Sequence, residues 1–343
     1  MANGIDTSSL PHGLRSFGLN NVDLSIVIVN YRSWQALEKC LDSFTKFTPE
    51  LNHEIIVVDN DSRDGKLDAF SQNYSHVAFI NNSFNNGFAN GCNLGANNAS
   101  GEFLLFLNPD TVLTSSTAID SMFEFAKKNS NIGITSCRRI NPEGKPEREI
   151  AFSNPWLIIG WIRAIYKLTN NKKIEKKFPN NEYIWHPDWV TGSVILIHSN
   201  LFNKVGKWNQ ESFWMYYEDV DLCRKIKSQN KHIALLRNVE LQHAHGGSSR
   251  VDSKTTSITK SEVVTSTHVY IQLHTMGLNR LALHLAIIVD TLLFQALIVL
   301  FTSFVFWRSP FRANVLVLIS TLKYYISAMM RGTWKSKRLN LNE

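Results

Sequence analysis

The chain has 343 residues, a formal net charge of +7 and a pI of about 9.1. Its length allows a large core in one large or two modest domains. A basic balance suits nucleic acid, a membrane surface or an anionic substrate. No nucleic-acid-binding signature is present, and basic residues gather at 172–177 and in the last thirty residues, beside long apolar segments. The charge therefore favours a membrane surface and an anionic substrate and speaks against a nucleic-acid partner.

Cysteine usage and the N-terminal segment indicate the compartment. The four cysteines are widely spaced and form no CxxC pair, which is typical of buried thiols in a reducing cytosol. Residues 1–21 are polar and lack the apolar stretch of a signal peptide. We therefore expect the catalytic part to lie in the cytoplasm.

The first half of the chain alternates predicted strands with predicted helices. Strands are expected at 24–30, 54–59, 76–81 and 103–107, and helices at 33–47 and 65–73; the stretch 85–95 should lead into a third helix that ends near 100. Alternation with short connections predicts a doubly wound, mostly parallel α/β sheet.

The second half is less regular. Further strands are expected at 132–136, 189–197 and 233–241, a turn-rich loop at 141–146, a charged loop at 170–181, and a helix within 213–227. From about 265 the pattern is helical, with apolar segments at 281–307 and 311–330. We expect an N-terminal segment (1–21), an α/β domain (22–260) and a C-terminal helical region (261–343).

The C-terminal helices are long enough to reach a membrane. A single span would place the basic residues that follow it, Arg308, Arg312, Lys335, Lys337 and Arg338, on the outer side, against the positive-inside tendency. A helical hairpin, or helices lying in the membrane interface, avoids this problem. A helical pair packed on a soluble domain is the alternative.

Asp110 is the first candidate site residue. It follows a continuous apolar run that ends at Asn108-Pro109, and proline cannot continue a sheet ladder. A carboxylate just beyond a strand's C-terminal end suits a divalent cation that holds a pyrophosphate. Asn108 and Asp110 could also merely build a polar turn.

Two other strand ends should meet Asp110 at one edge of the sheet. Asp59 could accept a hydrogen bond from a pyrimidine N3–H, and the backbone of Asn30 and Tyr31 could frame the ring. The glycine-rich and amide-rich stretch around Gly87 precedes a helix, whose N-terminus welcomes negative charge. Ordinary turn chemistry is the alternative for these residues, and it is favoured for Asn60.

Three acids lie at the start of a predicted helix, after a run of aromatic residues. Glu218 and Asp221 should share a helix face, and Asp219 should point elsewhere. An acid held against an aromatic wall is desolvated, which raises its proton affinity and makes it a competent general base. A solvated acidic helix start is the alternative.

A pair of histidines, His243 and His245, closes the last predicted strand before a glycine-rich turn. A histidine there could complete a metal site begun by Asp110. Alternate residues of a strand point to opposite faces, so at most one of the two should face the metal.

Taken in order, the motifs resemble family 2 glycosyltransferases, in particular the rhamnosyltransferase-like branch. The matching segments cover roughly 22–250 and include 25–32, 57–62, 85–93, 107–110, 190–193, 205–211, 213–223 and 243–248. The resemblance implies a GT-A fold and an inverting transfer from a nucleoside diphosphate sugar assisted by Mg²⁺ or Mn²⁺. The favoured donor is dTDP-rhamnose, and the acceptor is a lipid-linked cell-surface glycan at the cytoplasmic face of the inner membrane.

The resemblance also implies residue roles. Asp59 would read the base, Asp110 would be the last acid of the metal motif, and Asn108 stands where the first acid would be. Asp219 would be the catalytic base, while Glu218 could hold the acceptor. His243 would bind the metal, with His245 as second choice.

Some positions depart from the family pattern. Asn209 and Gln210 replace the usual Asp-Glu after a Phe, which leaves the role of that aspartate unfilled. The aromatic residues Trp189, Trp208, Trp214 and Tyr217 are candidates for stacking on sugar or for the core. Competing hypotheses are a UDP-sugar donor, a nucleotidyltransferase, and a membrane scaffold that has lost catalysis.

Overall fold

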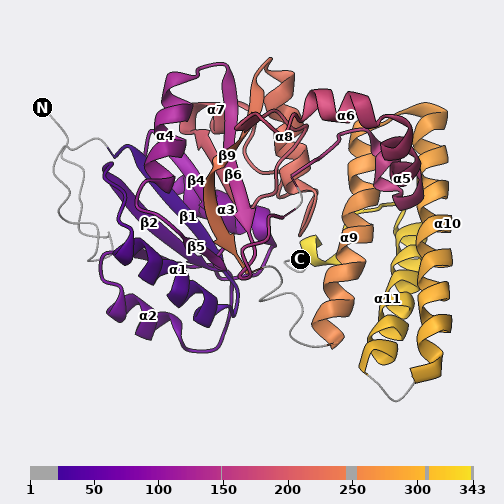
Figure 1. Ribbon diagram of the computed structural model, residues 1–343. Helices are drawn as coiled ribbons and strands as arrows, with labels where there is room; N and C mark the ends of the chain where they lie inside the picture. The colour runs from indigo at the N-terminus through magenta and orange to yellow at the C-terminus, as the bar shows by residue number, and fades with distance from the viewer. Residues whose placement is uncertain (1–21, 148, 245–252, 306–308, 341–343) are drawn as a thin grey trace, which may run out of the picture.

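The computed structural model describes residues 22–147, 149–244, 253–305 and 309–340. Within them, one mixed sheet runs in the order β3-β2-β1-β4-β8-β6-β9-β5, with β7 paired to β9 (Figure 1). Its strands are β1 (Leu24–Asn30), β2 (His53–Asp59), β3 (Ala78–Asn81), β4 (Phe103–Leu107), β5 (Thr111–Leu113), β6 (Ile132–Ile140), β7 (Ile184–Trp185), β8 (Val194–His198) and β9 (His232–His243).

The sheet has a parallel half and a mixed half. β3, β2, β1 and β4 run parallel, as the alternating pattern predicts, while β8 runs antiparallel to both β4 and β6. β6 and β9 are again parallel, and β5 returns antiparallel to β9. The parallel half forms the Rossmann-like part of the expected α/β fold, because each of its crossovers carries a helix.

Helices cover both faces of the sheet. They are α1 (Trp34–Lys46), α2 (Leu67–Asn73), α3 (Phe88–Asn97), α4 (Ala118–Lys128), α5 (Gly160–Thr169), α6 (Asn171–Lys177), α7 (Ser199–Lys204) and α8 (Glu218–Ser228). β1 shows why both faces are buried: Leu24, Ile26 and Ile28 pack with α1 and α4, whereas Val27 and Val29 pack with α3 and α8. Successive strand residues point to opposite faces, so a fully apolar strand requires this double cover.

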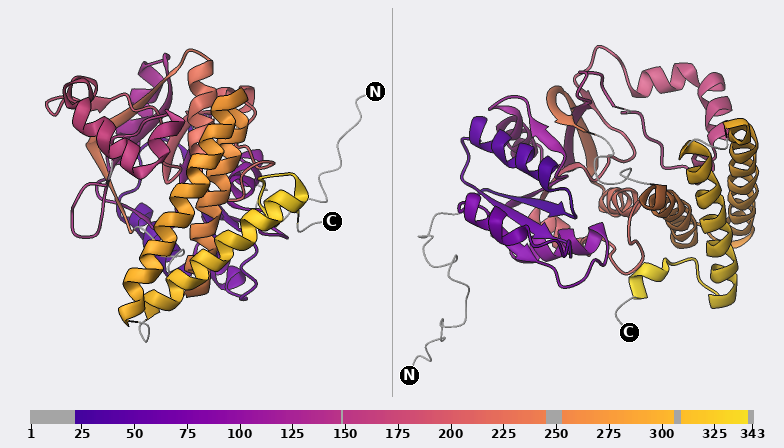
Figure 2. Two further views of the ribbon diagram at one scale, coloured as in Figure 1. Left: turned by 90° about the vertical axis from the view of Figure 1, so that its right-hand side faces the viewer. Right: turned by 90° about the horizontal axis from the view of Figure 1, so that it is seen from below.

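Three long helices stand beside the sheet domain: α9 (Ser253–His274), α10 (Gly277–Thr302) and α11 (Ser309–Arg331). They lie side by side, with α9 nearest the sheet domain and α10 farthest from it (Figures 1 and 2). Gly277–Thr302 and Phe311–Arg331 are long and apolar enough to cross a membrane, by length and composition alone. The domain boundary expected at 260 falls inside α9.

Several predicted elements have different limits. The charged loop expected at 170–181 contains α6, because Ile174 anchors its Lys- and Glu-rich turns in the core. The strand expected at 189–197 begins only at Val194, because residues 191–193 turn aside to contact other loops. The strands expected at 132–136 and 233–241 extend to Ile140 and His243 as they pair with each other. The C-terminal helices start at Ser253 rather than near 265.

Candidate active site

Asn30, Asp59 and Asp110 meet at one edge of the sheet. Asn30 and Asp59 are direct partners in the parallel β1–β2 register. β4 lies on the other side of β1 and stops at Leu107, two residues before Pro109, so that Asp110 follows its C-terminal end. The predicted convergence of the three strand ends is confirmed.

The Asp59 carboxylate is buried and held from several sides. It accepts hydrogen bonds from Asn30 Nδ2 (3.3 Å), from the Ser62 hydroxyl (2.5 Å) and from Ser62 N (3.3 Å). Burial raises the pKa of Asp59, and the hydrogen bonds from Ser62 and Asn30 oppose that rise. Asn30 is fully buried, while Tyr31 is 41% exposed beside it. The Tyr31 backbone, predicted to frame a base, thus lies beside the buried Asn30–Asp59 pair at this edge.

Asn60 has a structural role, as the turn reading of this residue predicts. Its side chain donates to Asn85 Oδ1 (3.1 Å) and to the Gly87 carbonyl (3.2 Å), and it accepts from Asn82 Nδ2 (2.7 Å). These bonds fasten the β2 end to the loop that precedes α3. Asparagine amides provide the donors and acceptors that a buried loop–loop junction needs.

Asp110 and His243 lie together, as predicted. Thr111 pairs with His243 in the β5–β9 register, and the Asp110 carbonyl accepts from Ala244 N (3.0 Å). The two side chains are buried and face each other, with His243 Nε2 3.3 Å from Asp110 Oδ1. Asn108 Nδ2 lies 3.4 Å from the same imidazole nitrogen. His245, the second choice for the metal, lies outside the described residues.

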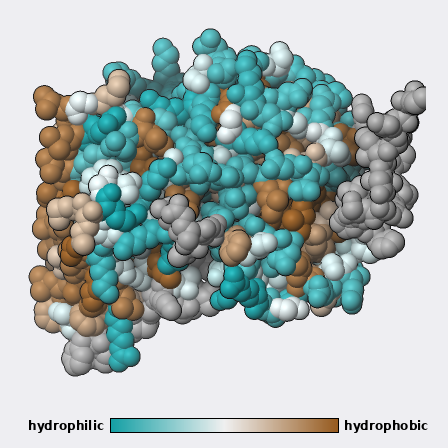
Figure 3. Space-filling view, turned by 180° about the vertical axis from the view of Figure 1, so that it is seen from behind, coloured by the Kyte–Doolittle hydropathy of each residue, from teal (hydrophilic) through white to brown (hydrophobic). Residues whose placement is uncertain are grey.

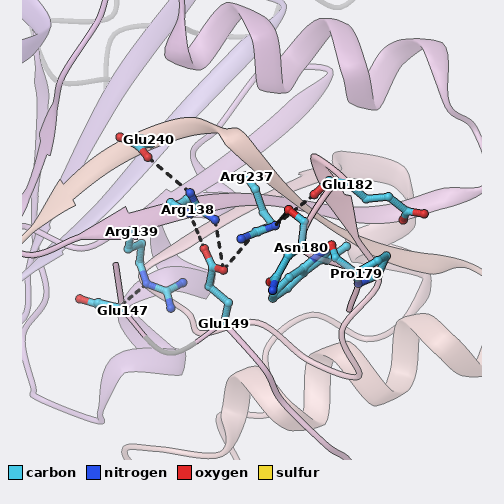
Figure 4. A network of polar contacts seen from close by, with 10 residues as sticks. Arg138, Arg139, Glu147, Glu149, Pro179, Asn180, Glu182, Arg237 and Glu240 are labelled. Atoms are coloured by element: carbon cyan, nitrogen blue, oxygen red, sulfur yellow. Dashed lines mark hydrogen bonds and ion pairs between the residues drawn. The ribbon is translucent and has the colours of Figure 1, made fainter. Parts of the chain in front are cut away.

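Glu147 and Arg139 complete this cluster and were not found from the sequence. Glu147 Oε1 lies 2.6 Å from His243 Nδ1, and Glu147 Oε2 lies 2.9 Å from Arg139 Nε. Nearby, Glu149 forms ion pairs with Arg138 and with Arg237 (Figure 4). Both arginines lie near the end of β6 and both glutamates follow the turn-rich loop 141–146, and no motif in the sequence marks any of the four. Only the pairing of β6 with β9 brings them to His243.

The charges of this cluster depend on one another. Burial alone would raise the pKa of Glu147, but hydrogen bonds from His243 and Arg139 lower it to about 2. Burial alone would lower the pKa of His243, but its bonds with Asp110 and Glu147 raise it to about 9. An imidazolium held this way must release a proton before Nε2 binds a cation.

The residues fit a divalent cation that is shared with a diphosphate. Within the described ranges, no group of three or more His, Cys, Asp and Glu side chains forms a self-sufficient metal site. Asp110 and His243 nevertheless offer one oxygen and one nitrogen as ligands. The bond between Glu147 and His243 Nδ1 orients the imidazole so that Nε2 faces Asp110. A cation with two protein ligands takes its others from water and phosphate. Arg139 Nη1 is buried with no hydrogen-bond partner among the described residues, as suits an anion.

Asp219 lies on the same side as this cluster. Its carboxylate accepts from Gly192 N (3.0 Å) and from Val220 N (2.8 Å). The neighbouring Ser193 carbonyl accepts from Asn108 N (3.0 Å), so one loop joins Asp219 to the metal motif. Burial raises the pKa of Asp219, while the two backbone N–H groups oppose that rise. Asp219 is therefore an acid with increased proton affinity at the edge of the site.

Glu218 and Asp221 have different surroundings. Glu218 is buried, its Oε2 has no hydrogen-bond partner among the described residues, and burial together with Asp219 raises its pKa well above the usual value. Asp221 forms ion pairs with His274 of α9 (2.8 Å) and with Lys225 (3.1 Å). Asp221 therefore joins α8 to α9.

The chain takes a strained path immediately before α8. Tyr216 and Tyr217 both have left-handed backbone conformations, with φ of 71° and 67°, which are unfavourable for bulky residues and are often found at functional sites. Gly87 supports this turn: at its φ of 92°, a Cβ would lie 1.9 Å from the Trp214 carbonyl oxygen. Phe88 N donates to that same oxygen (3.0 Å). Glycine is therefore required at position 87 for close packing against Trp214, independently of any contact with a ligand.

The aromatic candidates divide between core and site edge. Trp208 is 1% exposed and packs against Phe88 and Phe106 in the core, so it is not placed to stack on a sugar. Trp189 donates to the Phe152 carbonyl and packs on the same core. Trp214 is buried below Arg338, and Tyr217 packs on Tyr270 of α9.

Comparison with known proteins finds similar glycosyltransferases. Residues 25–187 match the glycosyl transferase family 2 model. A low-salt glycan biosynthesis hexosyltransferase of Haloferax volcanii is 28% identical over 64% of this chain and 67% of its own length. An N-acetylglucosaminyl-diphospho-decaprenol L-rhamnosyltransferase of Mycobacterium tuberculosis is 28% identical over 59% of this chain and 70% of its own length.

Solved structures share the fold at low sequence identity. A mannosyltransferase of Pyrobaculum calidifontis, solved with GDP-Man and Mn²⁺, superposes with a TM-score of 0.52 over 93% of this chain and 92% of its own, at 11% identity. GalNAc-T7, solved with UDP, GalNAc and Mn²⁺, superposes with a TM-score of 0.52 over 74% of this chain and 52% of its own, at 16% identity. The family match over residues 25–187 and the relatives support a family 2 glycosyltransferase, and the solved structures share the GT-A fold.

Proposed function

We propose that the protein is an inverting, metal-dependent transferase that moves L-rhamnose from dTDP-rhamnose to a lipid-linked glycan at the cytoplasmic face of the membrane. The main support is that Asp110, His243 and Asp219 lie around the same loop, residues 191–193. The resemblance to the rhamnosyltransferase-like branch supports the donor, as does the relative named for a rhamnosyl transfer to a diphospho-decaprenol acceptor.

The donor would lie across the strand ends. Asp59 and Tyr31 would bind the base, Gly87 and the start of α3 would approach the diphosphate, and Asp110 and His243 would hold Mg²⁺ or Mn²⁺. Such a cation, when bound, supplies positive charge that stabilises the departing diphosphate. The unpartnered Nη1 of Arg139 could bind a phosphate oxygen directly.

Asp219 would remove the proton from the acceptor hydroxyl. The oxygen then attacks the anomeric carbon from the side opposite the nucleotide, and the bond to the diphosphate breaks, so the configuration inverts. Burial raises the proton affinity of Asp219, which favours proton transfer near neutral pH. The buried Glu218 would hold the acceptor or stay neutral behind the base.

The apolar C-terminal helices support membrane association, because a lipid-linked acceptor keeps its reacting sugar near the bilayer surface. α10 exposes most of its apolar residues to the outside. A UDP-sugar donor is the nearest alternative. A silent scaffold is a further alternative, in which the fold is kept but the donor is neither bound nor consumed.

The test is donor hydrolysis and transfer over a panel of dTDP-rhamnose, UDP-glucose, UDP-galactose, UDP-galactofuranose and GDP-mannose, with and without Mn²⁺. We expect metal-dependent turnover of dTDP-rhamnose. In Asp219→Asn, turnover should fall by about 10²- to 10⁴-fold while nucleotide binding is retained. Glu124→Gln removes a charge from the exposed side of α4 and should change turnover only a few-fold. Turnover of a UDP-sugar instead would mean that the donor is a UDP-sugar and not dTDP-rhamnose. If no donor binds, the result would favour the hypothesis of a silent scaffold.

A further inference from the structure

The outer side of α10 is a continuous apolar stripe. Its exposed residues recur every three or four positions, which keeps them on one side of the helix. They are between 41% and 85% exposed and comprise Leu278, Leu281, Leu285, Val289, Leu293, Leu297 and Leu300. In Figure 3 apolar residues gather along the edge of the molecule formed by the helical bundle, whereas most of the remaining face is hydrophilic.

α5 extends this stripe from a different part of the chain. Trp161, Ile165 and Leu168 are exposed on one side of α5, at 60%, 53% and 83%. Ile159, immediately before α5, forms a cluster with Leu283 and Ile287 of α10, and Ile162 of α5 packs against this cluster. Trp156 Nε1 also donates to Asn279 Oδ1 (3.0 Å) just before α5. Two helices that are far apart in sequence thus lie in contact, and each exposes apolar residues.

α9 fixes the direction of the hairpin formed by α10 and α11. Ser257 donates to the Leu316 carbonyl (3.1 Å), and His268 Nδ1 lies 2.7 Å from His284 Nδ1. α9 is in turn fixed to the catalytic domain, because Ser266 donates to the Met215 carbonyl (2.7 Å). A hairpin that crossed a bilayer in this arrangement would draw the polar α9 and the catalytic domain into the lipid with it.

The charges of the hairpin also oppose a crossing. Asp290 lies mid-way along α10 and Lys323, which is exposed, lies mid-way along α11. Near the bilayer centre each would cost about 2.5–3.5 kcal/mol on insertion scales. The other charged residues of the two helices are Arg280, Arg312 and Arg331, all basic. A helix that lies in the plane of anionic headgroups instead gains from such basic side chains.

We propose that α5, α10 and α11 lie in the plane of one anionic membrane leaflet, as an anchor that does not cross the bilayer. The inference rests on the membrane-associated function proposed above and narrows it to one geometry. The occupant of the apolar stripe is lipid. The catalytic domain, held through α9, then stands at a set height above the leaflet.

The experiment measures immersion depth at three points of the α10 stripe. Leu278→Cys, Val289→Cys and Leu300→Cys lie eleven residues apart on nearly the same face of the helix, at about 16 Å per step. The four native cysteines are buried, so a spin label should react at the introduced thiol. Labelled protein is bound to vesicles of phosphatidylglycerol and phosphatidylcholine, and depth is read from oxygen and nickel-chelate relaxation. Ser71→Cys, exposed on α2, is the control that should stay in water.

An in-plane anchor predicts the same shallow depth at all three positions, to within about one helical turn or 5 Å. Leu168→Cys on α5 should reach that depth as well. A Val289 label roughly 16 Å deeper than the other two would overturn the proposal in favour of a span. If the protein does not bind vesicles and the stripe labels of two chains lie close together in a dimer, the proposal is wrong and the apolar stripe binds a second copy of the chain. No donor or acceptor is needed, so inactivity in the donor panel would not change these depths.

Discussion

Glu147 contacts His243, one of the two proposed metal ligands, on the side away from Asp110. It bonds His243 Nδ1 at 2.6 Å, which leaves Nε2 directed at Asp110. Carboxylates in this position orient a histidine ligand and increase its basicity. Arg139 holds the other oxygen of Glu147, so the orientation of His243 depends on a chain of two residues that a bound ligand need not contact.

The first prediction concerns Glu147→Gln. We expect Mn²⁺ affinity in the presence of a nucleoside diphosphate to fall by about 10- to 100-fold, because the negative charge behind His243 is lost. Titration calorimetry measures it directly. Glu149→Gln is the matched control, since Glu149 binds Arg138 and Arg237 instead. Equal losses in both variants would mean that the effect is general to this segment and not specific to His243.

Residue roles set by chain neighbours were predictable, and those set by distant contacts were not. Asn30, Asp59 and Asp110 each end an apolar strand, so the parallel register alone places them together. Glu147 and Arg139 are eight residues apart in sequence around an unremarkable turn. Their importance depends on where β6 lies beside β9, and no local pattern shows that two strands a hundred residues apart are partners.

At the scale of elements, the junction between α3 and the turn before α8 is the tightest packing in the site. Gly87 N-terminal to α3 lies against the backbone of Trp214, with no room for a side chain. Its φ of 92° and ψ of 176° belong to a region that only glycine adopts readily. This junction supports the strained Tyr216 and Tyr217 and thereby the position of Asp219.

The second prediction is that Gly87→Ala lowers the free energy of unfolding by at least about 2 kcal/mol, from backbone strain plus steric overlap. Gly144→Ala separates the two causes, because Gly144 also has a positive φ, 76°, but has nothing within 4 Å. That variant should cost only about 1 kcal/mol. Urea denaturation measures both, and similar costs would show that the contact with Trp214 is unimportant.

The first and last residues of a strand or helix were predictable where the pattern of apolar residues determined them. β1, β2 and β4 match their apolar runs closely, because each is buried on both faces. α6 was predicted as a loop, since its helix depends on one apolar anchor, Ile174, among charged residues. The strand expected from 189 starts at Val194 because Gly192 N bonds Asp219, a partner from another element.

At the scale of the molecule, Asp188 ties three segments together. Its carboxylate accepts from Ser153 N (2.9 Å), from Lys177 of α6 (2.8 Å) and from Lys227 of α8 (3.0 Å). Burial alone would raise the pKa of Asp188, but the bonds from Lys177, Ser153 and Lys227 outweigh it and lower the pKa to about 2.

The third prediction follows from that pKa. An aspartate with a lowered folded-state pKa stabilises the protein above its unfolded pKa of about 3.9 and loses this contribution as the pH falls towards 2. Asp188→Asn should therefore be less stable by about 1–2 kcal/mol at pH 7, and this difference should vanish near pH 2. Urea denaturation of both proteins at pH 7, 4, 3 and 2 measures it. A difference independent of pH would mean that packing, not charge, is responsible.

The contacts between α9 and the strained turn before α8 bear on how this protein could evolve. Tyr217 packs on Tyr270, and Asp221 pairs with His274, so the catalytic helix and the bundle were shaped together. An enzyme of this kind cannot exchange its anchor by recombination as if it were an interchangeable module. A chimera that joins this sheet domain to a foreign helical bundle would lose the packing of Tyr270 on Tyr217, close to the proposed base Asp219.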